Sequence, residues 1–286
     1  MKIRRPHYPV AVLCRVFDVS CSGYHAFVSR APSKRAQENA RLEVVIQAAH
    51  TRTRESYGPK RLQDELKDEG VTAGVGRIKR LRKKLGLRCK QVRKFKATTN
   101  SNHDLPVASN LLKQNFQSTR PNETWVTDIT YVPTEEGWLY LSGVKDLHTC
   151  ELVGHAMGAR MTKDLVGRAL VKAVGAKRPT PGLIHHSDRG SQYCAQDYRN
   201  LLQQFGMKAS MSRRGNCYDN APMESFWGTL KNELVHHRRY ETRAQAMREI
   251  TEYIEIFYNR QRRHSRLGNL SPATFTQRFY RQQQAA

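Results

Sequence analysis

The chain has 286 residues, long enough for one catalytic core and one or two small domains. Lys and Arg number 49 against 25 Asp and Glu, and the formal net charge of +24 indicates a polyanionic partner, with nucleic acid the first candidate. Residues 1–105 carry 24 of the basic residues against 9 acidic ones, so nucleic acid is expected to bind most strongly there. No apolar run approaches the roughly 20 residues that cross a bilayer, and no signal peptide follows the charged N-terminus. We therefore expect a cytoplasmic protein that binds no membrane.

The first region, residues 1–36, predicts a helical hairpin. One helix is expected from Pro9 to about Phe17 and a second from Ser22 through Val28, with a break between them. This pattern fits a helix-turn-helix and also fits an ordinary helical hairpin. A spacer rich in Arg, Lys, Ser and Pro then leads to a helix at about 38–50.

Residues 37–97 predict a basic helix-turn-helix-like domain that binds DNA. Tyr57-Gly58-Pro59 opens a helix that Gly70 ends, and a second helix runs from about Val75 to Leu85. In the second helix basic residues alternate with an apolar stripe, as in a recognition helix, although a solvated helix in a linker would show the same pattern. Residues 98–121 are polar and predict a linker. The basic residues expected to contact DNA are Arg77, Lys79, Arg80, Arg82, Lys83 and Lys84.

From residue 122 to 286 the pattern changes to that of an α/β domain. Three β-type segments separated by short turns predict an antiparallel meander. Helices and strands then alternate, which predicts a mixed sheet with helices packed on it. The expected strands are 123–133, 138–147, 151–158, 182–186 and 208–211, and the expected helices are 163–175, 195–205, 221–237 and 243–261.

Three acidic residues lie in distinctive settings in this domain. Asp128 interrupts a β-type run, Asp188 follows an apolar run and precedes Gly190, and Glu224 lies just inside a helix. An acid in a strand core is costly unless it is paired or bound to metal, and strand ends are where open α/β folds bind ligands. Each acid alone is more easily explained as surface charge. As a set they predict a carboxylate triad for hard divalent cations.

The short sequence motifs around these acids resemble those of the second-frame product of bacterial two-frame insertion sequences. The element order also resembles the ribonuclease H-like core of retroviral integrases and DDE transposases. The resemblance covers nearly the whole chain, including the region of Tyr57-Gly58. The segments that carry it are 125–131 (WVTDITY), 186–193 (HSDRGSQY), 218–226 (YDNAPMESF), and the tail from Tyr258-Asn259-Arg260 to Ser271-Pro272.

That resemblance implies a DNA transposase with a catalytic, metal-binding triad of Asp128, Asp188 and Glu224. Two Mg²⁺ or Mn²⁺ ions would serve cleavage of the element ends and transfer of the freed 3′-OH. The resemblance also implies a basic residue seven positions after the glutamate, Lys231, which shares a helix face with Asn220 and Glu224 and is expected to contact the DNA backbone. The resemblance further implies that the protein binds duplex DNA, both the terminal repeats of the element and the target. It also implies a first-frame protein as partner or fusion, a homo-oligomer assembled on DNA, and a location at the nucleoid.

Other polar and aromatic residues are expected beside the site. Asn220 is either a site residue or simply the helix N-cap, and His186 and Ser187 either position DNA or water or are hydrogen-bonded at a strand end. Asp146 is assigned to a turn or salt bridge and kept out of the triad. Trp227, like two nearby tyrosines, either stacks on bases or packs against the sheet.

Two other functions fit parts of the same sequence. A DNA-binding regulator of transposition would need the basic helices and no activity of its own. A simple ribonuclease H-like nuclease would keep the metals and cleave DNA without joining it, but would leave the N-terminal basic helices unexplained.

Overall fold

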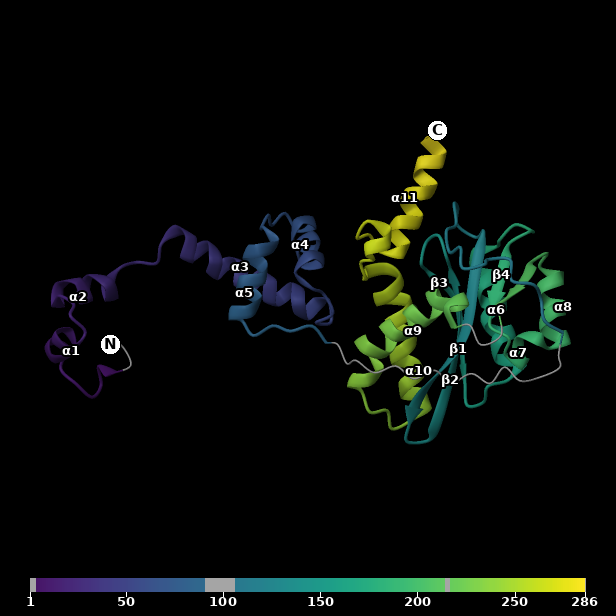
Figure 1. The fold of residues 1–286 in the computed structure, drawn as a ribbon, viewed down its shortest axis with the longest axis horizontal. Helices are drawn as coiled ribbons and strands as arrows, with labels where there is room; N and C mark the ends of the chain where they lie inside the picture. The colour runs from purple at the N-terminus through teal and green to yellow at the C-terminus, as the bar shows by residue number, and fades with distance from the viewer. Residues whose placement is uncertain (1–3, 91–105, 214–216, 286) are drawn as a thin grey trace.

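The computed structural model describes residues 4–90, 106–213 and 217–285. Along its long axis lie a helical hairpin, a three-helix unit and an α/β core, with the C-terminal helix projecting from the core (Figure 1). This arrangement confirms the predicted fold class, an all-α region followed by an α/β core with a mixed sheet. In the described part of the chain, no helix is long and apolar enough to cross a membrane.

Two short helices form the N-terminal hairpin, close to their predicted positions. They are α1, Val10–Val16, and α2, Cys21–Ser29. The Ser20 hydroxyl caps α2 by accepting a hydrogen bond from the Gly23 backbone N–H at 3.0 Å. The hairpin buries few of its apolar side chains, and Phe17, at the end of α1, is half exposed.

The three-helix unit packs around one small apolar core. It consists of α3 (Lys34–Arg52), α4 (Pro59–Asp68) and α5 (Val75–Lys84). α4 begins at Pro59 because proline suits the first turn of a helix, and Gly70 adopts a φ of +78° just after its end. The buried apolar side chains of this core are Leu42, Ile46, Ala49, Tyr57, Leu62, Leu66, Ala73, Ile78 and Leu81.

A five-stranded mixed sheet forms the centre of the α/β core, with strand order β3-β2-β1-β4-β5. The first three strands form the predicted antiparallel meander. β4 then pairs with β1 in parallel, and β5 pairs with β4 in parallel. The strands are β1 (Thr124–Thr134), β2 (Gly137–Asp146), β3 (Leu152–Gly158), β4 (Ile184–Ser187) and β5 (Lys208–Met211).

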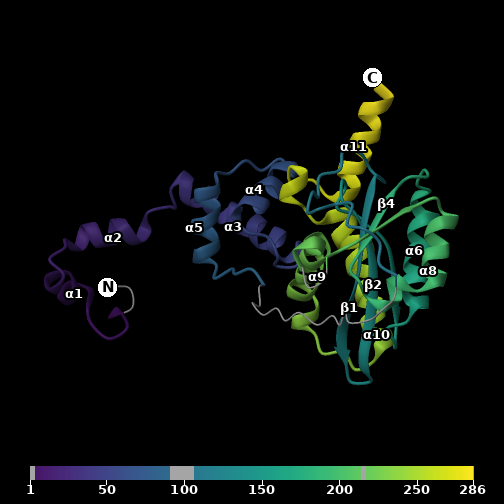
Figure 2. The same cartoon turned by 45° about the vertical axis from the view of Figure 1, so that its right-hand side comes forward.

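Helices cover both faces of this sheet (Figure 2). On one face lie α6 (Lys163–Lys177), α7 (Ser191–Cys194) and α8 (Gln196–Gln204), around buried side chains that include Trp125 and Tyr198. On the other face lie α9 (Ala221–Glu233), α10 (Arg243–Glu252) and the π-helical segment η4 (Tyr253–Gln261), around buried side chains that include Val126, Val132 and Trp227. The alternation of Trp125 and Val126 between the two cores follows from the period of two in a strand.

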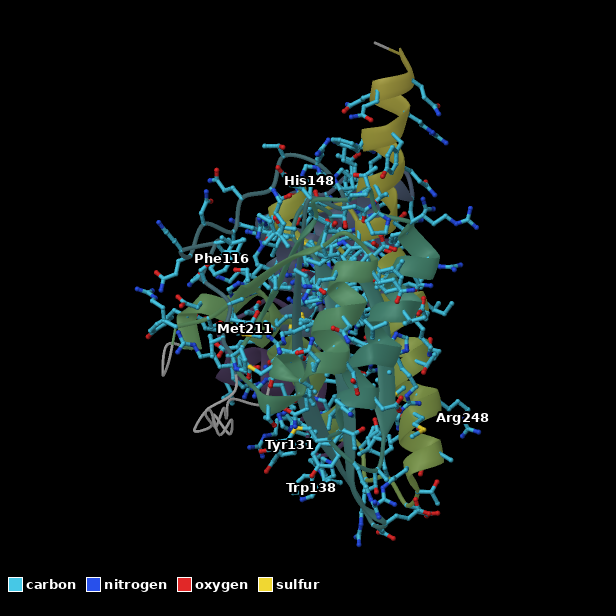
Figure 3. The ribbon with its side chains drawn as sticks, turned by 90° about the vertical axis from the view of Figure 1, so that its right-hand side faces the viewer. Phe116, Tyr131, Trp138, His148, Met211 and Arg248 are labelled. Carbon is cyan, nitrogen blue, oxygen red and sulfur yellow. The ribbon has the colours of Figure 1, made fainter. Side chains whose placement is uncertain are left out.

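The last helix, α11 (Pro272–Ala285), was not expected from the sequence. It begins at Pro272 and contacts the loop after β2, where the His148 ring lies 5.4 Å from the ring of Phe275 and 5.1 Å from that of Phe279, measured between centroids. Figure 3 shows His148 at the end of the sheet opposite to Tyr131 and Trp138. α11 therefore extends the core at the end away from the β1–β2 hairpin.

The described part of the predicted linker is part of the core. Leu112 is buried in the cluster between the sheet and α9. The Leu111 backbone N–H donates to the Ser210 hydroxyl at 2.9 Å, at the end of β5. Residues 106–121 thus run along the core, while 98–105 lie outside the described residues. The polar composition predicted a linker because the few apolar side chains, Leu112 among them, gave no periodic signal.

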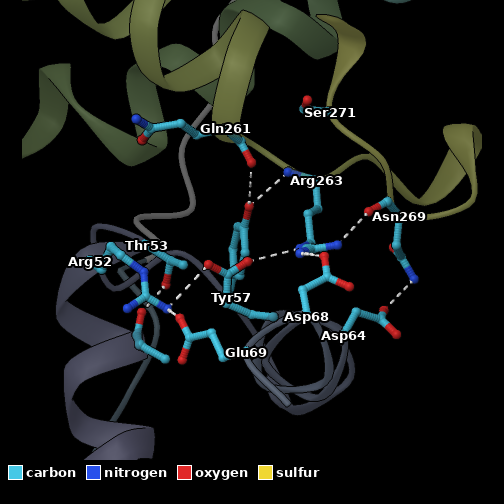
Figure 4. A network of polar contacts seen from close by, with 12 residues as sticks. Arg52, Thr53, Tyr57, Asp64, Asp68, Glu69, Gln261, Arg263, Asn269 and Ser271 are labelled. Carbon is cyan, nitrogen blue, oxygen red and sulfur yellow. Dashed lines mark hydrogen bonds and ion pairs between the residues drawn. The ribbon is translucent and has the colours of Figure 1, made fainter. Parts of the chain in front are cut away.

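Polar contacts join the three-helix unit to the C-terminal segment of the core (Figure 4). The Tyr57 hydroxyl donates to the Gln261 carbonyl at 3.3 Å and accepts from the Arg263 backbone N–H at 2.7 Å. The Arg263 guanidinium also donates to Glu65 at 2.9 Å and to Asp68 at 2.5 Å. These bonds bring α4 against the chain that follows η4, while α5 lies on the side of the unit away from the core in both Figures 1 and 2.

Candidate active site

The place where β1 and β4 separate brings two of the predicted acids together. The parallel pairing ends with Val126 opposite His186. Asp128 lies two residues further along β1, and Asp188 comes directly after the last residue of β4. Because the carboxyl ends of parallel strands are where open sheets bind ligands, both acids lie at the expected edge.

Glu224 reaches the same edge from α9. It occupies the first turn of the helix, whose buried face of Met223, Phe226, Trp227 and Leu230 packs on the sheet. Burial raises the pKa of Glu224 above its usual value. Since Glu224 also acts electrostatically on Asp128, three separate elements deliver three like-charged groups to one site.

Asp128 has a strongly raised pKa. Burial is the largest cause, and the nearby Asp188 and Glu224 carboxylates add to it, so that its pKa is raised to about 8. Two hydrogen bonds oppose this shift, one from the Ile129 backbone N–H and one from the Trp227 indole N–H to Asp128 Oδ2 at 3.0 Å. A bound cation would balance the negative charge that the three carboxylates bring together.

The chemistry of the donors fits a divalent cation, although the side chains do not form a closed ligand cluster. Carboxylate oxygens are the ligands that Mg²⁺ prefers. Within residues 4–90, 106–213 and 217–285, no three His, Cys, Asp or Glu side chains make a ready metal-binding group. Asp128 Oδ2 accepts a hydrogen bond from the Trp227 indole N–H, and Asp188 Oδ1 accepts one from the Gly190 backbone N–H at 2.9 Å.

Lys231 lies beside the acids, as its spacing predicts. Its ammonium sits 4.9 Å from the centroid of the Tyr131 ring, a cation–π contact. Burial lowers the pKa of Lys231, while the charge of Asp128 raises it. Lys231, on α9, thus lies over the part of β1 beyond its pairing with β4 and within electrostatic reach of Asp128.

The three residues expected beside the site have different surroundings. Asn220 occupies the N-cap position of α9 but makes no side-chain cap; its Nδ2 donates instead to the Thr127 carbonyl at 3.0 Å, and its Oδ1 is buried without a described partner. His186 bonds Ser210 at 2.8 Å through Nδ1, and burial lowers its pKa to about 4. The Ser187 hydroxyl donates to the Asp188 carbonyl at 2.8 Å. His186 therefore reads as a neutral structural group, whereas Asn220 ties α9 to the strand of Asp128.

Asp219 is a buried carboxylate that sequence reasoning did not single out. It accepts bonds from the Arg213 backbone and guanidinium at 2.7 to 3.1 Å, from Asn110 at 2.9 Å and from Gln114 at 3.0 Å. These bonds, led by that of the Arg213 side chain, hold its pKa well below its usual value. The residue lies in the motif at 218–226, but its partners near position 110 are too distant in sequence to be found there.

Asp146, kept out of the triad, has the turn role expected for it. Its two carboxylate oxygens accept from the Asn122 backbone N–H at 2.6 Å and from the Thr149 backbone N–H at 2.8 Å. Asp146 thus closes the loop between β2 and β3.

The basic helix α5 presents only part of the predicted DNA-binding set. Lys79, Arg80 and Lys83 are exposed. Arg82 is buried, and its Nη2 donates to Cys89 Sγ at 3.3 Å, so it stabilises the unit from within. The other two residues are engaged in ion pairs, Arg77 with Glu38 at 3.2 Å and Lys84 with Glu43 at 2.6 Å.

The mixed sheet and the acids at its edge define an integrase-type core preceded by an all-α unit. Family models agree: two models of the integrase core domain match residues 118–217 and 205–272, and a model of an HTH-like domain matches 36–95. The chain is 63% identical over 268 residues to the insertion element IS600 uncharacterized 31 kDa protein of Shigella sonnei, covering 94% of this chain and 98% of that protein. It is 40% identical over 270 residues to transposase InsF for insertion sequence IS3A of Escherichia coli (strain K12), covering 94% of each. The chain belongs to the family of insertion-sequence transposases.

Two solved structures are similar at low identity. A simian T-cell lymphotropic virus intasome in complex with PP2A regulatory subunit B56 gamma gives a TM-score of 0.48 at 15% identity, covering 75% of this chain and 70% of that one. The HTLV-2 integrase catalytic core domain in complex with magnesium gives a TM-score of 0.45 at 13% identity, covering 56% and 99%.

Proposed function

We propose that this transposase cleaves the DNA ends of its insertion element and joins the freed 3′-OH to target DNA, with divalent cations held by Asp128, Asp188 and Glu224. The observation that carries the proposal is the meeting of the three acids where β1 and β4 separate, with the pKa of Asp128 raised to about 8. Such a cluster of carboxylates destabilises the fold unless it binds a cation or a proton.

The chemistry consists of two exchanges at phosphorus. In the first, a water oxygen bonds to the phosphorus at the element end, the bond from that phosphorus to the 3′ oxygen breaks, and the 3′ oxygen leaves as a hydroxyl. In the second, this hydroxyl bonds to a phosphorus of the target strand, whose own 3′ oxygen leaves. Neither step needs a covalent bond to the protein.

The residues of the chain hold the groups that react. Asp128, Asp188 and Glu224 would hold two Mg²⁺ or Mn²⁺ ions, which when bound activate an attacking oxygen and stabilise a leaving one. Lys231 lies next to Asp128 and can hold a phosphate of the DNA backbone beside the acids. The Asn220 bond to the Thr127 carbonyl fixes the start of α9, and so Glu224, against β1.

The proposed partner is duplex DNA, both as element ends and as target. The exposed Lys79, Arg80 and Lys83 on α5 support a grip on phosphates by the unit at 37–97. A homo-oligomer would pair two ends, and a first-frame protein would act as partner or fusion. Chromosomal DNA as substrate puts the site of action at the nucleoid.

One experiment separates this function from its two rivals. Labelled DNA carrying the element's ends is incubated with Mg²⁺ and either the wild-type chain or the Glu224→Gln variant, and binding, cleaved strands and joined strands are measured together. We expect the wild type to give all three and the variant to give binding alone. Binding without cleavage by the wild type would support a regulator, and cleavage without joined strands would support a nuclease; either result would contradict the proposal.

A further inference from the structure

Trp227 connects the helix of Glu224 to the strand of Asp128. Its indole ring is 4% exposed, and its N–H donates to Asp128 Oδ2 at 3.0 Å. An indole has one hydrogen-bond donor and no acceptor, so this bond uses its whole capacity. Among the described residues, Trp227 is the one side chain that donates to Asp128.

The position of Trp227 on α9 makes this bond a link between two acids. It lies three residues after Glu224, about one turn along the same helix. The helix that delivers Glu224 to the site therefore also holds the Asp128 carboxylate. A shift of α9 along the sheet would move both groups at once.

The sheet leaves room for the indole where the bond is made. Gly143 lies opposite Asp128 in the β1–β2 ladder. A Cβ at position 143 would lie 2.9 Å from Cη2 of Trp227, closer than such contacts occur. The missing side chain of Gly143 thus lets the indole lie close enough to β2 for its N–H to reach Asp128.

We propose that Trp227 is a positioning residue that fixes the orientation of the Asp128 carboxylate relative to Glu224, and thereby sets the affinity of the site for divalent cations. The inference rests on the proposed function. Partners that hydrogen-bond to a ligating carboxylate hold it in its binding orientation, and their loss typically weakens metal binding or activity by roughly 10- to 100-fold. Packing alone would need only the ring of Trp227, whereas positioning needs its N–H.

The test is the Trp227→Phe variant of the full chain, which keeps an aromatic ring and removes the donor. Trp138→Phe is the matched control, because Trp138 is 49% exposed on the β1–β2 hairpin and lies outside the proposed site. Two quantities are measured: the affinity for Mn²⁺ by calorimetric titration, and the Mg²⁺ concentration that gives half-maximal end cleavage. Thermal unfolding shows whether each variant is folded.

We expect Trp227→Phe to weaken Mn²⁺ binding and to raise the half-maximal Mg²⁺ concentration by about 10-fold or more, with the control unchanged. Gly143→Ala, which keeps the indole N–H but displaces it from Asp128, should shift both quantities in the same direction. Folded Trp227→Phe with wild-type Mn²⁺ affinity and Mg²⁺ dependence would overturn the positioning role alone. A wild-type chain that binds no Mn²⁺ and cleaves without Mg²⁺ would overturn the proposed function as well.

Discussion

At the scale of single residues, the balance of charges around Asp128 controls the site. Burial and two neighbouring carboxylates raise its pKa to about 8, against opposing hydrogen bonds from the Ile129 backbone and the Trp227 indole. Without a cation, the ionised form of Asp128 is therefore disfavoured in the folded chain at neutral pH. Cation binding and deprotonation of Asp128 are linked, because a ligating carboxylate must be ionised.

This linkage predicts a pH-dependent effect of Asp128→Asn on stability in the absence of divalent cations. The folded pKa lies above the unfolded value near 3.8, so the protonated acid stabilises the fold at low pH and that stabilisation is lost as the pH rises toward 8. The variant cannot ionise. Its free energy of unfolding should therefore gain on that of the wild type between pH 4 and pH 8, as measured by urea denaturation. An equal difference at both pH values would contradict the raised pKa.

At the scale of elements, the buried carboxylate of Asp219 holds the segment before β1 to the start of α9. It lies in η2 (Cys217–Asn220), just before the helix, and binds Asn110 and Gln114 from the segment before β1. Because Glu224 follows on the first turn of α9, the placement of that acid depends on this network.

Replacing Asp219 with Ala should lower the free energy of unfolding by roughly 3 kcal/mol, the upper part of the range for hydrogen bonds to a charged group. Its ion pair with Arg213 adds little, because the Arg213 side chain is 55% exposed. Asp197→Ala is the control, since Asp197 makes an exposed pair with Lys163. Urea denaturation of both variants tests this, and equal stabilities would refute the role of Asp219.

The periodic elements could be predicted from the sequence, and the contacts between distant segments could not. Alternation of apolar residues predicted β1 and β5 to within a residue or two, and the motif settings predicted the triad positions. The docking of Leu112 and the bond of Trp227 to Asp128 join residues about a hundred positions apart. The sequence therefore indicates only a packing or stacking role for Trp227, because its donor finds a partner only once α9 lies on the sheet.

At the scale of the whole molecule, the three-helix unit is tied to the core by α4 while α5 faces away. Arg262, the residue before Arg263, is buried and extends these contacts. Its guanidinium forms an ion pair at 2.8 Å with Glu233, at the end of α9. The three-helix unit and α9 thus contact the same short segment. This arrangement gives the basic helix a defined position relative to the acids.

The contacts of Arg263 should govern how firmly the unit is held. In Arg263→Ala, α4 loses the ion pairs to Glu65 and Asp68, and we expect amide hydrogen exchange to become faster along α4 while exchange in the sheet stays unchanged. Arg239→Ala is the control, because its pair with Glu135 is exposed and lies on the core. Unchanged exchange along α4 would show that the Arg263 side chain does not hold the unit.

The exposed face of α5 should determine the salt dependence of DNA binding. Lys79→Ala, Arg80→Ala and Lys83→Ala should each reduce the log–log slope of affinity against salt by about 0.9, one phosphate contact each. Arg82→Ala should leave the slope unchanged and lower stability instead, because Arg82 is buried. Fluorescence anisotropy with duplex DNA at several salt concentrations measures these slopes. Wild-type slopes in all three exposed variants would place the DNA grip elsewhere.

The central claim is that Asp128, Asp188 and Glu224 form one cation-dependent catalytic site. The most direct measurement compares Mg²⁺-dependent cleavage and joining of end DNA by the wild type, Asp128→Asn and the control Asp164→Asn, whose carboxylate is 74% exposed on α6. The account predicts that Asp128→Asn binds DNA but neither cleaves nor joins it, while Asp164→Asn matches the wild type. Cleavage by Asp128→Asn at the wild-type rate would contradict it.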